Sequence, residues 1–154
     1  MFLYTTENGI DAKGRVSVPA SFRAAVAPDP LNGIYVWRSF NGPFLEGCGQ
    51  RLMDEYADAL DEMDPYDDRR VAIERVIFGG ARALTFDSTG RISLPKEFAD
   101  YAGLDVRATF VGLGKRFEIW SPEAIAEQHG QDLETARENK HALKPRRRAA
   151  GEGA

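Results

Sequence analysis

The chain has 154 residues, of which 43% are hydrophobic and 29% charged, and its net charge is −4. These values are typical of a globular protein built as one domain or as two half-sized units, and they exclude a uniformly basic surface for nucleic acid. One cysteine, Cys48, excludes an internal disulfide framework, and the first residues form neither a signal peptide nor a membrane span, so we expect a cytoplasmic protein.

Apolar periodicity and turn-forming residues divide the first half of the chain into short strands and helices. Asp67 is expected to cap the last of these helices, and Gly79-Gly80 to end it. The predicted elements are strands within 2–10 and at 16–18, a helix at 20–27, strands at 34–37 and from 44, and helices at 50–63 and after residue 67.

The second half repeats this order. Ser121-Pro122-Glu123 begins a last helix that continues toward His129 or somewhat beyond. The other predicted elements are strands at 83–86 and 91–94, a helix at 95–101, and strands at 108–113 and 117–120.

The predicted fold class is α+β, with duplicated strand-turn-strand and short-helix units that share a β-rich core with peripheral helices. We expect a first unit with a linking helix at 1–80, a second unit at 81–143, and a basic disordered tail at 144–154. Six Lys or Arg against one acid between residues 137 and 148 make this end of the chain the most basic.

One segment occurs twice, 76 positions apart. Residues 11–22 read Asp-Ala-Lys-Gly-Arg-Val-Ser-Val-Pro-Ala-Ser-Phe, and residues 87–98 read Asp-Ser-Thr-Gly-Arg-Ile-Ser-Leu-Pro-Lys-Glu-Phe. Asp, Gly, Arg, Ser, Pro and Phe are identical in the two copies. An internal repeat of this kind indicates two copies of one structural unit.

The residue types in this segment suit a tight turn that presents an arginine. Asp11 and Asp87 can accept backbone N–H groups, and a glycine such as Gly14 or Gly90 tolerates a positive φ. If the flanking strands pair as a hairpin, Arg15 lies at the edge of the turn, where its guanidinium can fork onto guanine or phosphate. A solvated turn with a surface ion pair explains the same residues, so residue chemistry alone leaves DNA binding and a purely structural role open.

The segment Asp-x-x-Gly-Arg-Val-x-x-Pro, followed by Phe-Arg, resembles the motif of the AbrB-like (SpoVT-AbrB) DNA-binding family. Its tandem arrangement, the Met-Phe-Leu start and the segments 78–81 and 112–120 are similar to the MraZ branch of that family, over about residues 1–143. The resemblance implies a regulator of the division and cell-wall gene cluster. It also implies a homo-oligomeric ring, association with the nucleoid, and binding to short direct repeats of double-stranded DNA upstream of its own operon, generally with repression.

Position by position, Lys13, Gly14 and Arg15 match the family's DNA-reading turn, and Arg91 matches its second copy. Thr89 stands where the first turn has Lys13. We therefore expect the first turn to dominate base reading, and Arg91 to position phosphates. A ring would present many such turns at once, at a spacing of about 10 bp, and its binding should fall steeply with salt.

The remaining candidates have weaker support. Cys48 with His129 or His141 lacks the spacing of a metal or thiol site, and the acids between residues 54 and 68 favour a solvated surface. The aromatic strand residues favour a core or subunit interface over base stacking, and the basic tail favours neither DNA binding nor a solubilising role.

No nucleotide-binding fingerprint occurs, so we predict no enzyme, cofactor or metal. The alternative function is a ring-forming protein-protein scaffold or antitoxin-like module.

Overall fold

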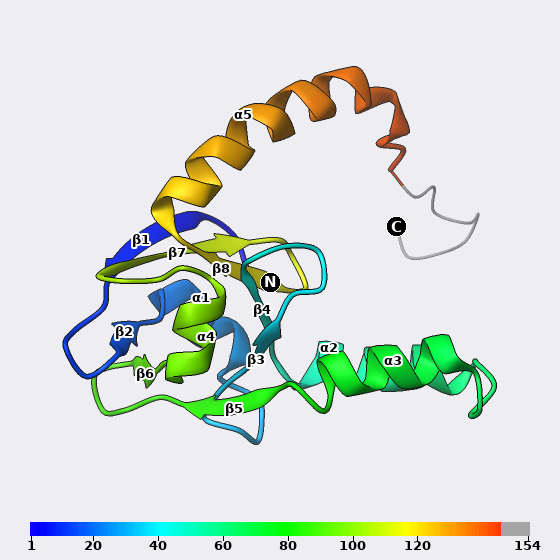
Figure 1. Cartoon of the computed structure of the whole chain (residues 1–154), viewed down its shortest axis with the longest axis horizontal. Helices are drawn as coiled ribbons and strands as arrows, with labels where there is room; N and C mark the ends of the chain where they lie inside the picture. Colours follow the sequence, from blue (N-terminus) through cyan, green and yellow to red (C-terminus); the bar gives the residue numbers. More distant parts are fainter. Residues whose placement is uncertain (146–154) are drawn as a thin grey trace, which may run out of the picture. The chain divides into compact units, whose positions relative to one another are not determined.

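A six-stranded antiparallel sheet forms the centre of the computed structural model, which describes residues 1–145 (Figure 1). The strand order is β1-β7-β8-β4-β3-β5, and a separate ribbon pairs β2 with β6. The strands are β1 (Thr5–Gly9), β2 (Arg15–Ser17), β3 (Gly33–Arg38), β4 (Leu45–Cys48), β5 (Arg82–Thr85), β6 (Arg91–Ser93), β7 (Arg107–Gly112) and β8 (Phe117–Trp120). Residues 146–154, most of the predicted tail, lie outside the described part.

The helices follow the predicted order. Asp67 caps α3 by accepting a hydrogen bond from the Arg69 backbone N–H, as predicted, and α5 continues well past His129. The helices are α1 (Ala20–Val26), α2 (Gln50–Asp61), α3 (Asp68–Ile77), α4 (Lys96–Tyr101) and α5 (Pro122–Glu138), with a short 3₁₀ helix at Lys140–Ala142. The α+β class is confirmed.

Strand pairing joins the two copies of the repeated segment instead of closing a hairpin within each. β1 pairs with β7, and β2 pairs with β6. Within the first copy the strand pairing across the turn is limited to an isolated bridge, Ile10 to Val16, beside which the Asn8 side chain donates to the Ser17 carbonyl at 2.7 Å. Two three-residue strands form few ladder hydrogen bonds, so the β2–β6 ribbon depends on the packing of its inward side chains. The pairing of β2 with β6 buries Val16 and Ile92 together in the common core.

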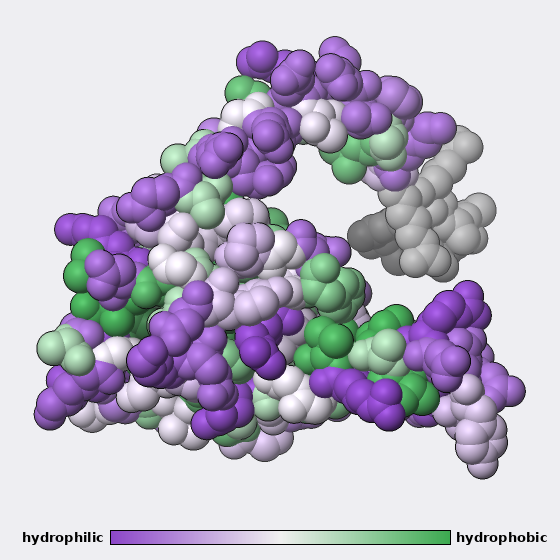
Figure 2. Space-filling view, viewed as in Figure 1, coloured by the Kyte–Doolittle hydropathy of each residue, from purple (hydrophilic) through white to green (hydrophobic). Residues whose placement is uncertain are grey.

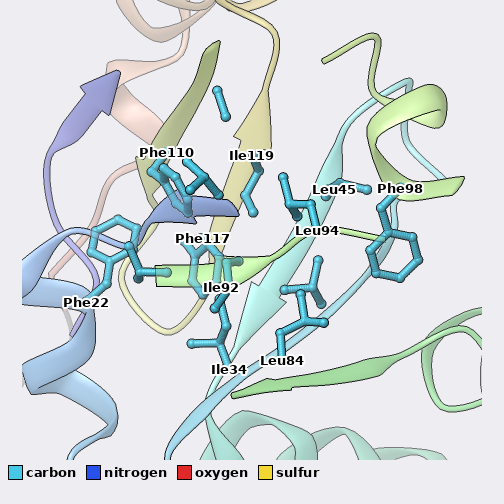
Figure 3. Close-up of a cluster of buried hydrophobic side chains, with 14 of the residues drawn as sticks. Phe22, Ile34, Leu45, Leu84, Ile92, Leu94, Phe98, Phe110, Phe117 and Ile119 are labelled. Carbon is cyan, nitrogen blue, oxygen red and sulfur yellow. The ribbon is translucent and has the colours of Figure 1, made fainter. Parts of the chain in front are cut away.

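The main core draws side chains from both copies of the repeat (Figure 3). Phe22 lies at its aromatic centre, with ring centroids 5.2 Å from Phe2, 6.1 Å from Phe110 and 5.3 Å from Phe117. Equivalent positions of the two copies are buried alike, namely Val16 and Ile92, Val18 and Leu94, and Phe22 and Phe98. Because these side chains face inward, the alternate residues of β2 and β6 face solvent.

A smaller apolar cluster lies under the α2–α3 hairpin. It contains Trp37, Cys48, Leu52 and Ile77. Cys48 is fully buried in β4, and its burial raises the pKa of the thiol to about 12. Cys48 is therefore a packed core residue that stays protonated at neutral pH, which argues against the nucleophile considered from the sequence.

Residues 123–145 separate from residues 1–122 as a second unit. This unit is largely α5, whose residues are all at least partly exposed. Across the described chain, 1–145, no helix combines the length and apolar character that a membrane crossing requires.

Candidate nucleic-acid interface

The first turn is held by the Asp11 carboxylate. Its Oδ1 accepts backbone N–H groups of Lys13 and Arg15, each at 2.9 Å, and its Oδ2 accepts the Arg15 Nε–H at 2.7 Å. The Gly14 N–H donates to the Asp11 carbonyl at 3.0 Å, and Gly14 has a φ of 81°. Glycine is suited to this left-handed conformation because it has no Cβ.

The second turn repeats this geometry. Asp87 Oδ1 accepts the backbone N–H of Thr89 at 2.9 Å and that of Arg91 at 3.0 Å, and Oδ2 accepts the Arg91 Nε–H at 2.9 Å. Gly90 has a φ of 79°. One contact is specific to this copy, because the Thr89 hydroxyl donates to Asp87 Oδ1 at 2.9 Å. The side chain that replaces Lys13 therefore braces the turn and carries no charge.

Both turn carboxylates are stabilised in the ionised form. The backbone N–H of Arg15 is the largest cause of the lowered pKa of Asp11, and the backbone N–H of Arg91 is the largest cause of the lowered pKa of Asp87. Hydrogen bonds to a carboxylate favour its charged state. At neutral pH each turn therefore holds a carboxylate anion that orients the arginine beside it.

The β2–β6 ribbon places both arginines on one outward face. Arg15 pairs with Ser93, and Ser17 pairs with Arg91, so the two arginines lie diagonally across the ribbon. Ser17 and Ser93 are exposed, and the intervening Val16 is fully buried. The contact between the turns is direct, because Arg91 Nη1 lies 3.7 Å from Asp11 Oδ2.

This face can recognise an extended polyanion. The Arg15 and Arg91 side chains are 34% and 32% exposed, and each bonds its own aspartate through Nε. Apart from the 3.7 Å approach of Arg91 Nη1 to Asp11, their terminal nitrogens have no acceptor within residues 1–145 and can reach an external one. Lys13 is exposed and forms no ion pair within residues 1–145. Terminal guanidinium nitrogens bind phosphate oxygens or the major-groove edge of guanine in the same forked geometry.

The structure brings all the predicted site residues to this ribbon, namely Asp11, Lys13, Gly14, Arg15, Asp87, Gly90 and Arg91. It adds Arg23 of α1, whose guanidinium lies against Gly90 of the second turn. The sequence contains one sign of this asymmetry, since Ala99 occupies the position in the second copy that Arg23 occupies in the first.

Cys48 and the acids between residues 54 and 68 lie outside the ribbon, in β4 and in and around the α2–α3 hairpin. Among the side chains of residues 1–145, no group of three or more His, Cys, Asp or Glu is placed to hold a metal ion.

Known proteins resemble this chain along nearly its whole length. A family model described as "MraZ protein, putative antitoxin-like" matches residues 77–145. A protein of Caulobacter vibrioides, named Transcriptional regulator MraZ, is 43% identical over 150 residues, which cover 97% of this chain and 96% of the relative. Proteins of the same name from Phenylobacterium zucineum and Rickettsia canadensis are 40% and 41% identical, over 97% and 80% of this chain and 93% and 83% of their own lengths.

Proposed function

The chain belongs to the MraZ family of transcriptional regulators, and from this premise we propose that it binds double-stranded DNA in a sequence-specific manner through the β2–β6 ribbon. Arg15, with Lys13 and the backbone of Gly14, reads bases and adjacent phosphates. Arg91 holds the duplex chiefly through phosphates. The protein carries out this function in the cytoplasm, in association with the nucleoid.

The observation that carries the proposal is the pairing of two aspartate-braced arginines on one exposed face. A structural role alone would be satisfied by the aspartate bonds to the turn backbone. The outward guanidinium ends serve no contact inside the described chain except the 3.7 Å approach of Arg91 to Asp11. Preorganised arginines of this kind lose less side-chain entropy on binding than free ones.

We propose that the protein acts as a ring of identical subunits. One ribbon supplies few cations, and the whole chain is negatively charged, so a single subunit would bind DNA weakly. Several ribbons engaging one duplex multiply the affinity without new kinds of contact. Short direct repeats spaced by about one helical turn, roughly 10 bp, would match subunits on one face of the DNA.

An apolar surface supports this assembly. Figure 2 shows hydrophobic residues gathered where the α2–α3 hairpin meets the sheet. Phe40 is 59% exposed, and Val76 and Phe78 are each 37% exposed. A hollow of about 260 Å³, lined by residues such as Trp37 and Leu60, lies in the same region. Exposed apolar groups around such a hollow are typical of a protein-protein interface, and a second copy of this chain is the occupant that the ring requires.

We propose that the DNA target lies upstream of the protein's own gene and that binding represses the operon. Footprinting the purified protein on that DNA tests the proposal. The expected result is protection of short, evenly spaced direct repeats that weakens as salt rises from 50 to 200 mM. Uniform protection, or none at any salt concentration, would contradict sequence-specific binding.

A protein-protein scaffold or antitoxin-like module is the second candidate, favoured by the antitoxin-like description of the matching family. That function requires the apolar surface but no pair of exposed arginines. A protein that forms rings and leaves its upstream DNA unprotected would support this second candidate.

A further inference from the structure

The hollow where the α2–α3 hairpin meets the sheet contains a buried carboxylate with an incomplete set of partners. Glu46 of β4 lines this hollow of about 260 Å³, and its side chain is only 7% exposed. Within residues 1–145 its cationic neighbour is Arg116, whose Nε lies 3.5 Å from Glu46 Oε1 and is itself a buried nitrogen without a hydrogen-bond partner. A buried carboxylate is stabilised by cationic groups that donate hydrogen bonds to it, so Glu46 is suited to a further donor that enters from the hollow.

Aromatic side chains form walls around this carboxylate. Trp37, Phe40 and Tyr56 line the hollow, and the Trp37 and Tyr56 rings meet edge to face with their centroids 6.2 Å apart. Aromatic faces attract ammonium and guanidinium groups. Leu60 and Met63 also line the hollow and suit the methylene stem of a long side chain. The lining therefore fits a lysine or arginine side chain better than a purely apolar one.

The charge around the hollow also favours a basic partner. Residues 50–78, which span the α2–α3 hairpin, contain nine acidic residues and four arginines, a net charge of −5. Residues 137–148, with six Lys or Arg and one acid, have a net charge of +5. The two segments are therefore complementary in charge, which favours the approach of the basic segment of one subunit to the hairpin of another.

The described part of the basic segment presents a lysine and a leucine side by side. Lys140–Ala142 form a 3₁₀ helix that ends at Leu143. Because residues three apart eclipse in a 3₁₀ helix, Lys140 and Leu143 lie on one face, and Lys144 lies off it. Leu143 is 82% exposed, and Lys140 is exposed and has no ion pair in the part of the chain that the structure describes. An exposed leucine adds nothing to phosphate binding, so this face fits an apolar, acidic protein surface better than DNA.

We propose that Lys140 of one subunit inserts into the hollow of a second copy of this chain, where its ammonium group donates to Glu46 and its stem packs on the aromatic walls. Leu143 packs on the apolar rim of the hollow, where Phe40 is 59% exposed. This inference rests on the proposed function, since it names a pair of surfaces through which subunits of the ring meet.

The two surfaces have the properties that a ring requires. A closed ring needs two different, complementary surfaces on every subunit, so that each copy contacts the next in the same way. The hollow and the face of Lys140 and Leu143 form such a pair. The 17 residues of α5, which precede this face, span about 25 Å and can carry it to a neighbouring subunit.

The first experiment measures assembly of the full-length protein without DNA, by analytical ultracentrifugation over a range of concentrations. Lys140→Ala should raise the subunit concentration needed for half-assembly by about tenfold, because it removes the partner of a buried carboxylate. Lys144→Ala is the matched control, since it removes the same charge from the same segment, and it should assemble as wild type does. Equal losses in the two variants would contradict the inference, because they would indicate attraction between net charges and no specific pocket.

Glu46→Gln tests the other side of the contact. It keeps the shape of the side chain and removes its charge, so it should weaken assembly by a factor similar to that of Lys140→Ala. Combining the two changes should weaken assembly no further, since both remove the same contact. Fully additive losses, in a double variant that melts as wild type does, would refute the pairing of these two residues.

A labelled synthetic peptide of residues 137–148 keeps the inference testable if Glu46→Gln does not fold. By fluorescence anisotropy the peptide should bind full-length Lys140→Ala, whose hollows no longer receive a lysine from its own copies. The same peptide carrying Lys140→Ala should bind several-fold more weakly. Equal binding of the two peptides, or binding of neither, would overturn the inference.

The failure of this inference can be distinguished from the failure of the proposed function. If wild type assembles and Lys140→Ala assembles equally well, the ring stands and the inference fails. If wild type is monomeric at every concentration, the proposed ring itself fails. Unchanged assembly of Lys140→Ala together with weaker binding to a scrambled duplex would assign Lys140 to DNA phosphates and overturn the inference.

Discussion

Asp11 Oδ2 of the first turn lies 3.7 Å from Arg91 Nη1 of the second turn, while it also accepts a 2.7 Å hydrogen bond from Arg15 Nε. One carboxylate therefore orients the arginines of both copies. No matching contact joins Asp87 to Arg15 in the described chain. The ribbon departs from two-fold symmetry at this contact. Mutation of Asp11 and mutation of Asp87 should therefore have different effects on DNA binding.

We predict that Asp11→Ala and Asp87→Ala both lower the melting temperature by a few degrees, since each removes an acceptor of backbone N–H groups in its turn. Asp11→Ala should lower DNA affinity more, because it releases both arginines. Thermal melting and a mobility-shift assay on the upstream DNA measure the two effects. Unchanged melting and affinity in Asp11→Ala would show that the carboxylate has no part in holding the turn.

We predict that Arg15→Ala abolishes the preference for the upstream repeats and leaves the fold intact. A bidentate contact to a base contributes about 1–3 kcal/mol of discrimination per turn, and a ring adds several turns. Arg91→Ala should weaken binding less and should affect repeat and scrambled duplexes alike. The same mobility-shift assay gives the rank order, and wild-type affinity in Arg15→Ala would refute the assignment of the reading turn.

Local sequence patterns predicted the positions of the elements, because caps and breakers act over a few residues. Asp67 caps α3 through the N–H of a residue two positions away, and Pro19 and Pro95 precede α1 and α4 with nearly the same backbone angles. The buried alternation of β2 and β6 was also readable from Val16 and Ile92. These features depend on intrinsic preferences that tertiary packing then reinforces.

Strand partners were harder to predict because the alternation of β2 is the same in a local hairpin and in a ribbon shared between copies. The choice depends on long-range packing of Val16 against Ile92, 76 positions away. The position of Arg23 against the second turn depends on the same pairing, since the Val18 N–H donates to the Gly90 carbonyl directly before α1 begins. The Phe-Arg pair that follows the first motif includes Arg23, but the sequence of one copy does not show that this guanidinium lies against the turn of the other copy.

We predict that Phe22→Ala destabilises the protein more than Phe98→Ala, although the repeat makes them equivalent positions. Both are buried, but only Phe22 has ring contacts with Phe2, Phe110 and Phe117. A buried Phe→Ala change costs about 3–5 kcal/mol, and the better-packed site should lie at the upper end. Urea unfolding measures both variants, and equal or reversed midpoints would contradict this asymmetry of the core.

We predict that acid destabilises the protein in part through Asp67. Hydrogen bonds from the side chain and backbone of Arg69 lower the pKa of its carboxyl from 3.8 to about 2. A pKa depressed in the folded state contributes stability above about pH 4, and this contribution is lost as the pH falls toward 2.

Asp67→Asn keeps a capping acceptor but does not titrate, so its melting temperature should fall less than that of wild type between pH 4 and 2. Thermal melting across this range supplies the comparison. The pKa values of Asp11 and Asp87 shift in the same direction, and their acid response should persist in the variant. Parallel curves for the two proteins would rule out a contribution from Asp67.

We predict that Gly90→Ala impairs DNA binding more than Gly14→Ala, at a similar cost in stability. Both glycines have φ near 80°, where a side chain costs about 1–2 kcal/mol, so urea midpoints should fall by comparable amounts. A methyl group on Gly90 would also displace the Arg23 guanidinium, whereas one on Gly14 would meet only a carbonyl oxygen. Arg23→Ala removes the same guanidinium, so each of the two changes should reduce the salt slope of binding, and combining them should reduce it no further. A full additional loss in the double variant would mean that Gly90 and Arg23 act on DNA independently.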